Sequence, residues 1–293
     1  MYFFIINKQS GNGFKVWKKL LPLLAKLNIE YKTSFITKNE QLLNLKAEIN
    51  SLHIKAIVIV GGDGTVHHIL PFIEEASIPI GIIPAGSGND FARALKIPKK
   101  SSLALKKLLQ GTVKQVDIIY VNGEPCTSVV GVGFDAKVTD ITNRSNIKQW
   151  LNYLKIGKFS YVVGVLRTLF LFKPKEVVIT VDGKKRTYPH VWLIAIANTP
   201  FYGGGLKICP TANETDGILN ICIADSLSKW EVLLLFPLIF LGKHTVHQGV
   251  TFVKGKTIEI STDLPLLVQA DGEVLGTTPV SITVSKQKLN IIL

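Results

Sequence analysis

The sequence predicts an α/β protein in two parts, a doubly wound, Rossmann-like parallel sheet over residues 1–120 and a β-rich domain over residues 121–293. In the first part, strand-like and helix-like runs alternate, the order typical of a parallel sheet covered by helices on both faces. In the second part, strand signals follow one another closely, and turn signals such as Asp182-Gly183 join several of them. A chain of 293 residues is long enough for two domains, and we expect a cleft between them.

In the first part, four strands and two helices are expected. Residues 56–60 are all apolar, as a parallel strand covered on both faces should be. Trp17, Leu20 and Leu24 lie at helical spacing. The expected strands are Tyr2–Ile6, Tyr31–Phe35, Ala56–Val60 and Pro79–Ile83, and the expected helices are Phe14–Leu27 and Asn39–Ile49.

In the second part, short strands dominate and two helical inserts interrupt them. The expected inserts are Asn152–Phe172 and Ser228–Leu241, and the expected strands are Gln115–Val121, Thr127–Val132, Val177–Val181, Val191–Ala197, Ile218–Ile223, Thr257–Ile260, Leu266–Ala270, Val280–Val284 and Lys288–Ile292. No internal repeat interrupts this plan.

Composition narrows the class of partner. The net charge of +13 favours an anionic partner, either a nucleotide, a nucleic acid or an anionic membrane face, and a solvated basic surface is an equal alternative. Basic residues interleaved with aromatic ones along one face would indicate a nucleic-acid binder, and this pattern is missing. The longest apolar run, Val232–Leu241, is too short to span a bilayer and indicates a buried or membrane-surface helix. Three scattered cysteines and no signal peptide favour a cytoplasmic protein.

A glycine-rich loop, Gly61-Gly62-Asp63-Gly64-Thr65, directly follows the third expected strand. Glycines let backbone N–H groups approach phosphate oxygens, and the following helix adds its N-terminal dipole. Asp63 in such a loop is reasonable if it helps to hold Mg²⁺ against a nucleotide. An ordinary strand-to-helix turn with an N-cap is the alternative.

Two further loops shift the balance toward a nucleotide site. Pro84–Ala92 follows the fourth expected strand, and Ser10–Gly13 follows the first. Because parallel strands place their C-terminal loops along one edge, the three loops are expected to lie together. Neither a P-loop nor a dinucleotide-binding glycine fingerprint is present, which disfavours P-loop ATPases and standard dehydrogenases.

Together with further motifs along the chain, these loops resemble the diacylglycerol kinase catalytic family, which includes bacterial lipid kinases and the sphingosine and ceramide kinases. The resemblance covers nearly the whole chain in order. It rests on Asn7, Ser10-Gly11, Gly61–Thr65, Pro84–Ala92, Gly131–Asp135, Asn198, Gly203–Gly205, Pro210, Asp216-Gly217 and Asp271–Glu273.

The resemblance implies a C-terminal β-sandwich-like domain and ATP bound in the cleft between the domains. It implies an ATP-dependent kinase that phosphorylates a lipid hydroxyl, with diacylglycerol as the default substrate and phosphatidic acid as the product. The nucleotide contacts carried over are Asn7, Lys8, Ser10, Gly11, Thr37, Gly61, Gly62, Asp63, Gly64, Thr65, Gly86, Ser87 and Asn89.

The resemblance also implies the catalytic groups. Glu273 matches the family's general base, with Asp271 beside it on the same turn, although an ordinary hairpin with an exposed Glu is the alternative. Asp117 matches an aspartate that joins Asp63 in holding Mg²⁺ through water. A second, structural metal site is expected at Asn213, Asp216 and Ile218, with a solvated turn as the alternative.

His67-His68 departs from the family pattern, and these residues are expected either to touch the nucleotide or to pack on the helix start. NAD kinase, which shares the Gly61–Thr65 loop, and a non-catalytic lipid-binding member of the fold are the rival functions. A lipid kinase must work transiently at the inner membrane face, so an anionic membrane surface is the expected partner, and a homodimer is possible. Lys15, Lys18 and Lys19 are candidate head-group contacts.

Overall fold

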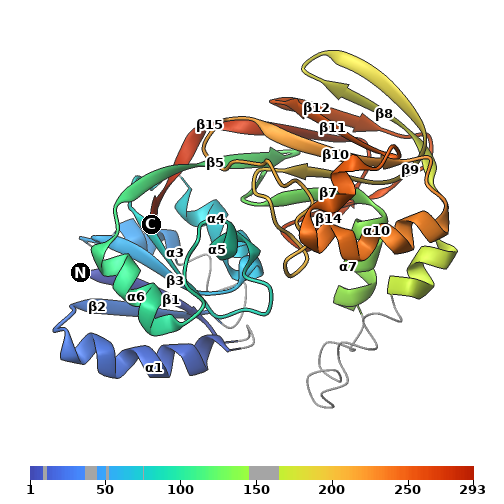
Figure 1. Cartoon of the computed structure of the whole chain (residues 1–293). Coiled ribbons are helices and arrows are strands. Elements are labelled where there is room, and N and C mark those ends of the chain that lie inside the picture. The colour runs from blue at the N-terminus through green and yellow to red at the C-terminus, as the bar shows by residue number, and fades with distance from the viewer. Residues whose placement is uncertain (9–11, 37–44, 51–52, 75, 145–164) are drawn as a thin grey trace.

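The computed structural model describes residues 1–8, 12–36, 45–50, 53–74, 76–144 and 165–293. It has two halves, a helix-covered parallel sheet and a larger antiparallel assembly of strands with helices on one side (Figure 1). The predicted fold class, an N-terminal parallel sheet and a C-terminal β-sandwich-like domain, is confirmed. Ser10, Gly11 and Thr37, much of the helix predicted over residues 39–49, and most of the insert predicted over residues 152–172 lie outside the described residues.

The N-terminal sheet has the order β2-β1-β3-β4, and all of these neighbours are parallel, as the alternating pattern predicted. The buried stripe of α1, with Trp17, Leu20 and Leu24, packs into the core that this sheet shares with its helices. The elements of this half are β1 (Tyr2–Asn7), α1 (Gly13–Lys26), β2 (Tyr31–Ile36), α3 (Leu45–Asn50), β3 (Ala56–Gly61), α4 (Asp63–Ile73), β4 (Ile80–Pro84), α5 (Asp90–Ala94) and α6 (Ser101–Gln110).

The second half is built on antiparallel pairs in the order β14-β13-β7-β9-β8-β12-β15, with β10 and β11 added beside β9. Its strands are β5 (Val113–Val121), β6 (Glu124–Cys126), β7 (Val129–Gly133), β8 (Lys175–Val181), β9 (Lys184–Ala197), β10 (Leu219–Asp225), β11 (Val250–Gly255), β12 (Thr257–Ser261), β13 (Leu267–Ala270), β14 (Glu273–Thr277) and β15 (Val280–Ile292). Its helices are α7 (Phe134–Arg144), residues 165–171, α10 (Lys229–Leu241) and the 3-10 turn η1 (Lys243–Val246).

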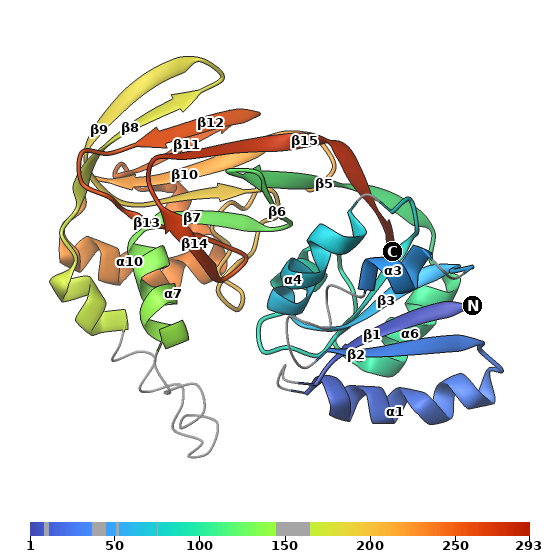
Figure 2. The ribbon, with the colours of Figure 1, turned by 180° about the vertical axis from the view of Figure 1, so that it is seen from behind.

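Two long strands, β5 and β15, join the halves (Figure 2). The prediction of separate strands at 280–284 and 288–292 is wrong, because β15 continues through both and its pairing with β5 merely shifts register between Val284 and Lys288. Near its end, β15 also pairs in parallel with β4 at Ile80, and Leu289 and Ile291 are buried in the N-terminal core. The last residues of the chain thus complete the first sheet.

The predicted helix at Ser228–Leu241 is α10, which begins with a capping box between Ser228 and Glu231 and ends at Gly242 in the left-handed conformation. Among the described residues, the structure has no helix long and apolar enough to cross a membrane. The sequence likewise predicts that the apolar run at 232–241 is too short to span a bilayer.

Candidate active site

Three loops meet at the carboxyl edge of the N-terminal sheet, because β1, β3 and β4 are neighbours in it. The side-chain amide of Asn7 donates to the hydroxyl of Thr65 (3.2 Å), which joins the end of β1 to the loop after β3. The backbone N–H of Ala85 donates to the carbonyl of Gly61 (2.8 Å), and that of Asn12 donates to the carbonyl of Ala85 (3.3 Å). The described parts of the loops therefore lie together as the sequence predicted.

The glycines at this edge permit a close approach of two backbones. A Cβ atom at Gly86 would lie 2.6 Å from the Cα atom of Gly62, and one at Gly62 would lie 2.8 Å from the Cα atom of Gly86. Asn89 closes the second loop, since its Oδ1 accepts from the N–H of Gly86 (2.9 Å) and its Nδ2 donates to the carbonyl of Gly86 (2.8 Å). Side chains at Gly62 and Gly86 would force the loops apart.

Asp63 connects the first glycine loop to α5. Its carboxylate accepts hydrogen bonds from the backbone N–H groups of Asp90 and Phe91, each at 3.0 Å. Burial is the main cause of a raised pKa of Asp63, and the nearby charges of Asp90 and Asp271 raise that pKa further against the effect of the two hydrogen bonds. Asp63 thus lies in a buried position with two other carboxyl groups nearby.

A buried carboxylate with two other carboxyl groups nearby fits a divalent cation at Asp63. Carboxylate oxygens are the hard ligands that Mg²⁺ prefers, and each oxygen of Asp63 keeps acceptor capacity beyond its one hydrogen bond. Within the described part of the chain, no three His, Cys, Asp or Glu side chains form a complete metal cage. Mg²⁺ would therefore need phosphate or water oxygens as well.

Asp90 ties α5 to the second half of the molecule. Its carboxylate accepts from the backbone N–H of Gly204 (2.6 Å) and pairs with Arg93. The guanidinium of Arg93 in turn lies 5.7 Å from the ring centre of Phe201. The loop that carries Gly203–Gly205 is thereby docked beside the glycine loops.

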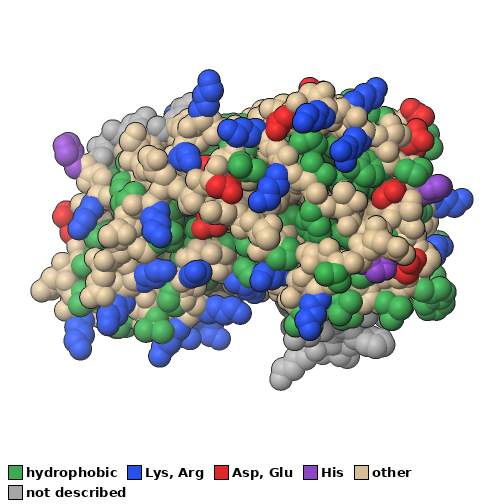
Figure 3. Space-filling model, turned by 45° about the horizontal axis from the view of Figure 1, so that its top comes forward, with side chains coloured by type: hydrophobic (Ala, Val, Ile, Leu, Met, Phe, Trp, Pro, Cys, Tyr) green, Lys and Arg blue, Asp and Glu red, His purple; other side chains and the backbone are tan. Residues whose placement is uncertain are grey.

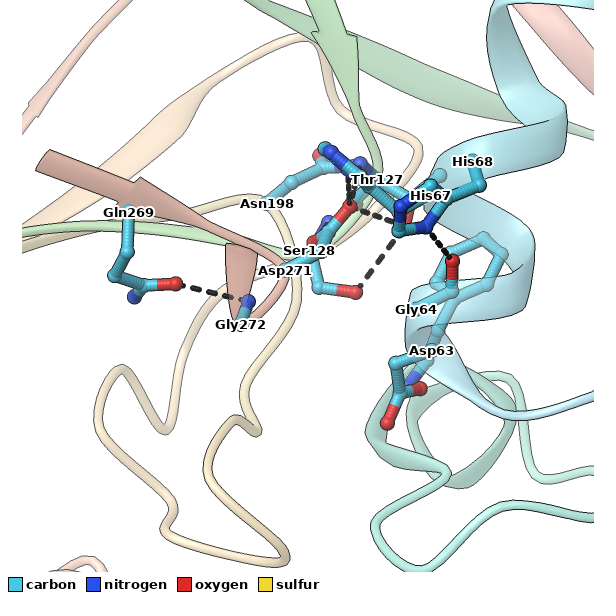
Figure 4. A network of polar contacts seen from close by, with 11 residues as sticks. Asp63, Gly64, His67, His68, Thr127, Ser128, Asn198, Gln269, Asp271 and Gly272 are labelled. Carbon is cyan, nitrogen blue, oxygen red and sulfur yellow. Dashed lines mark hydrogen bonds and ion pairs between the residues drawn. The ribbon is translucent and has the colours of Figure 1, made fainter. Parts of the chain in front are cut away.

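The turn Asp271-Gly272 joins β13 to β14 and faces α4 from the second half (Figure 4). The buried carboxylate of Asp271 accepts from the N–H groups of Thr127 (2.9 Å) and Ser128 (2.8 Å) and contacts Nδ1 of His67 (3.4 Å). Burial alone would raise the pKa of Asp271, but the bonds to His67, Thr127 and Ser128 lower it below its ordinary value. Asp271 thus anchors the turn as an ionised group.

Two further side chains hold Gly272. Its N–H donates to Oε1 of Gln269 (2.9 Å), and its carbonyl accepts from Nδ2 of Asn143 on α7 (3.0 Å). Nε2 of Gln269 reaches the buried carboxyl of Asp135 (3.4 Å), whose pKa is raised to about 6, chiefly by burial. Turn and helix are fastened together before Glu273 begins β14.

Glu273 reaches across to the first glycine loop. Its Oε1 lies 3.5 Å from the position that a Cβ atom would take at Gly64. Glu273 is half-buried, so that one carboxylate of the second half stands at the loop edge of the first and keeps access to solvent. An ordinary exposed hairpin Glu would not have this neighbour.

The two histidines bind different partners. Nδ1 of His68 lies 2.6 Å from the carbonyl of Gly64, one turn back in α4, whereas His67 faces Asp271. Burial lowers the pKa of His67, but the hydrogen bond and charge of Asp271, with the charges of Glu273 and Glu124, outweigh burial and raise it. The sequence predicted that the histidines touch the nucleotide or pack on the helix start. His68 packs on the helix start, and His67 instead forms a contact between the two halves.

Asp117 lies with the loop at 213–218. Its Oδ1 is 2.8 Å from Nζ of Lys288, and its Oδ2 accepts from the N–H of Gly217 (2.7 Å). Lys288 also donates to the carbonyl of Thr215 (3.3 Å). The joint magnesium role predicted for Asp117 and Asp63 stays a prediction.

The loop itself uses its polar oxygens internally. Asn213 Oδ1 accepts from the N–H (3.2 Å) and hydroxyl (2.9 Å) of Thr215, and Asp216 Oδ1 accepts from the N–H of Ile218 (3.0 Å). Lys288 supplies a cation here. The second metal site expected at Asn213, Asp216 and Ile218 also stays a prediction.

A basic hollow, which was not predicted from the sequence, lies beside the loop after β4. It has a volume of about 210 Å³ and is lined by Pro84, Asn89, Ala92, Arg93, Lys96, Ile97 and Lys99. Arg93, Lys96 and Lys99 lie within seven residues of one another in the sequence, which is a signal for local positive charge. Figure 3 shows a further indentation between the two halves along the lower edge of the molecule.

Fold and site together define a two-domain α/β protein in which phosphate-compatible glycine loops face a carboxylate-bearing turn of the second domain. Residues 1–121 match the model of the diacylglycerol kinase catalytic domain, and residues 128–293 match the model of the YegS C-terminal NAD kinase beta sandwich-like domain. The chain therefore belongs to the diacylglycerol kinase family of lipid kinases, as the resemblance implied.

Individual relatives support this membership. YtlR of Bacillus subtilis (strain 168), which its name places among the lipid kinases, is 31% identical over 99% of this chain and 98% of its own length. The diacylglycerol kinase of Mycobacterium tuberculosis (strain CDC 1551 / Oshkosh) is 32% identical over 81% of this chain and 76% of its own. A crystal structure of a diacylglycerol kinase from Bacillus anthracis str. Sterne matches with a TM-score of 0.77 and 25% identity, over 99% of this chain and 96% of that one.

Proposed function

We propose that this protein transfers the γ-phosphoryl group of ATP to the hydroxyl group of a membrane lipid, with diacylglycerol as the acceptor and phosphatidic acid as the product. The observation that carries the proposal is the position of Glu273 beside Gly64. It sets a carboxylate from one half of the chain against a phosphate-compatible loop from the other. Phosphoryl transfer needs this combination of positioned phosphates and a group that takes the hydroxyl proton.

In the proposed reaction, the phosphates of ATP lie beside the glycine loops at Gly61–Thr65 and Gly86–Asn89. Glu273 accepts the proton of the lipid hydroxyl. The hydroxyl oxygen forms a bond to the γ-phosphorus while the bond from that phosphorus to the bridging oxygen of ADP breaks. Mg²⁺, when bound, would neutralise phosphate charge, and we propose Asp63 as the residue that would hold it.

The remaining groups of the turn keep Glu273 in place. Asp271 binds the N–H groups of Thr127 and Ser128, and Gln269 and Asn143 hold Gly272. We propose that Asp271 acts on the reaction as a positioning residue, because its carboxylate is buried and already accepts several hydrogen bonds. Glu273 is the catalytic base.

The test is transfer of labelled γ-phosphate from ATP with Mg²⁺ into a panel of lipids in mixed micelles, with NAD as a soluble comparison. Label in diacylglycerol is the expected result. Label in NADP would overturn the lipid substrate and favour the function of the NAD kinases. No label in any acceptor would favour a non-catalytic member of the fold.

The assignment of the base is tested with Glu273→Gln, which keeps the size of the side chain and removes its basicity. Turnover is expected to fall by about 10²-fold or more while ATP still binds. A variant that turns over as fast as the unchanged protein would show that another group takes the proton. Binding of a fluorescent ATP analogue provides the check that the site is intact.

A further inference from the structure

Helix α10 presents an apolar stripe to solvent. Trp230, Leu234, Leu238 and Leu241 recur at helical spacing on its outer side, and Leu234 is 70% exposed and Trp230 66% exposed. The inner side packs into the core through Leu235 and its neighbours, so the helix is apolar all round. Helices of this kind are normally covered on every side.

The helical residues 165–171 extend the stripe. Leu171 is 68% exposed, and the rings of Phe170 and Trp230 meet edge to face with centres 6.0 Å apart. Nζ of Lys229 donates to the carbonyl of Phe170 (2.6 Å), which fastens the two segments to each other. The α10 face consists of Phe170, Leu171, Trp230, Leu234, Leu238 and Leu241.

The two segments that form the α10 face carry more basic than acidic side chains. Across residues 165–175 and 228–247, the only acidic side chain is Glu231, and its carboxylate accepts from the N–H of Ser228 in the helix cap. The basic side chains in the same two stretches are Arg167, Lys173, Lys175, Lys229 and Lys243. In Figure 3, hydrophobic side chains gather along the lower right of the molecule, on the side where α10 lies.

We propose that the α10 face is the surface by which this protein docks on an anionic lipid bilayer. Apolar side chains on segments with an excess of basic residues match the acyl region and the anionic head groups of a bilayer surface, and Trp230 suits the boundary between them. A second copy of the chain is the less favoured occupant, because a two-fold contact would bring these positively charged segments against each other. The inference rests on the proposed function, since a lipid substrate is held in a bilayer.

Docking is tested without ATP, by sedimentation of the full chain with large unilamellar vesicles of phosphatidylcholine alone or mixed with phosphatidylglycerol. The unchanged protein is expected to bind the mixed vesicles more tightly. Leu234→Glu is expected to weaken this binding by about tenfold or more, because it places a charge in the apolar stripe. The matched control is Leu103→Glu, at a position 51% exposed on α6, which should bind as the unchanged protein does.

Equal binding by Leu234→Glu and the unchanged protein would overturn the proposal, as would a dimer in sedimentation velocity that Leu234→Glu dissociates. A second readout uses activity. Leu234→Glu should phosphorylate a short-chain, monomeric diacylglycerol as fast as the unchanged protein and a vesicle-embedded one more slowly. If no lipid is ever labelled but vesicle binding still falls in Leu234→Glu, docking stands and the proposed function fails.

Discussion

Nδ1 of His67 lies 3.4 Å from Oδ2 of Asp271, and this contact joins α4 of the first half to the turn that precedes Glu273 in the second. Asp271 is buried and ionised, with a lowered pKa, and His67 has a raised pKa. Each group therefore favours the charged form of the other. The contact is therefore expected to be strongest where His67 is protonated.

His67→Asn should make the stability of the protein less dependent on pH. A histidine whose pKa is raised on folding contributes stability below its unfolded pKa of 6.5, and loses that contribution as pH rises through the folded value. The unchanged protein should exceed the variant in free energy of unfolding by about 1 kcal/mol at about pH 6 and by less at about pH 8.5. Urea unfolding at both pH values measures this difference.

His68→Asn is the matched control, because Nδ1 of His68 contacts the carbonyl of Gly64 and not a carboxylate. The stability difference between this control and the unchanged protein should stay constant across the same pH range. A His67→Asn difference that is equally constant would mean that the contact with Asp271 carries no charge.

Gly86→Ala should destabilise the protein and impair ATP binding. The new Cβ atom would lie 2.6 Å from the Cα atom of Gly62, so one of two backbone loops must move. Overpacking of this kind costs about 1–3 kcal/mol. Thermal unfolding with and without ATP measures both effects.

Gly64→Ala is the comparison within the same loops, because the added Cβ atom meets only Glu273 Oε1, at an ordinary 3.5 Å. Its melting temperature should stay close to that of the unchanged protein. If both variants melt alike, the close approach of Gly62 and Gly86 does not limit stability.

Local patterns were enough to predict the first sheet and the place of its loops. The apolar strand at 56–60 and the alternation around it lead to a parallel sheet, and a parallel sheet necessarily puts the loops after β1, β3 and β4 at one edge. The sequence also predicted helix α10 and the turns at Asp182-Gly183 and Asp271-Gly272, because the signals for these elements span only a few residues.

Contacts between distant residues could not be predicted in this way. Three of these contacts join residues separated by 100 or more positions. They are the contact of Asp90 with Gly204, that of Asp117 with Lys288 and the pairing of β15 with β4. Periodicity reports which face of an element is buried but not which element covers it. The resemblance to a family supplied the role proposed for Glu273, and the packing supplied its neighbour Gly64.

Asp135→Asn should stabilise the protein at neutral pH. The pKa of Asp135 rises from 3.8 to about 6 on folding, chiefly through burial, so the unfolded chain ionises first and stability falls as pH rises from about 4 to about 6. Ionised Asp135 therefore costs the folded protein roughly 3 kcal/mol of stability, and an amide at this position avoids that cost because it does not ionise. The free energy of unfolding of the variant, relative to that of the unchanged protein, should therefore rise between about pH 4 and about pH 7. Urea unfolding at several pH values across this range measures the difference. A difference that stays constant would contradict the burial of a carboxyl group here.

Lys288→Met should destabilise the protein, because it leaves the buried carboxylate of Asp117 without its cation. The ammonium of Lys288 is partly exposed, so we expect a loss of about 2 kcal/mol instead of the larger cost of breaking a fully buried pair. Adding Asp117→Asn should recover part of the loss, and a double-mutant cycle in urea isolates the pair.

Lys288→Met also tests whether Lys288 takes the place of a metal ion beside the site predicted at Asn213, Asp216 and Ile218. With Lys288 removed, the carboxylate of Asp117 and the carbonyl of Thr215 both lose their cation, and both are oxygen ligands of the kind that Mg²⁺ accepts. We expect Mg²⁺ to raise the melting temperature of Lys288→Met more than that of the unchanged protein, since in the latter the ammonium already neutralises this carboxylate. A larger effect of Mg²⁺ on the unchanged protein, abolished by Asp216→Ala, would instead place a metal at the 213–218 loop beside the lysine.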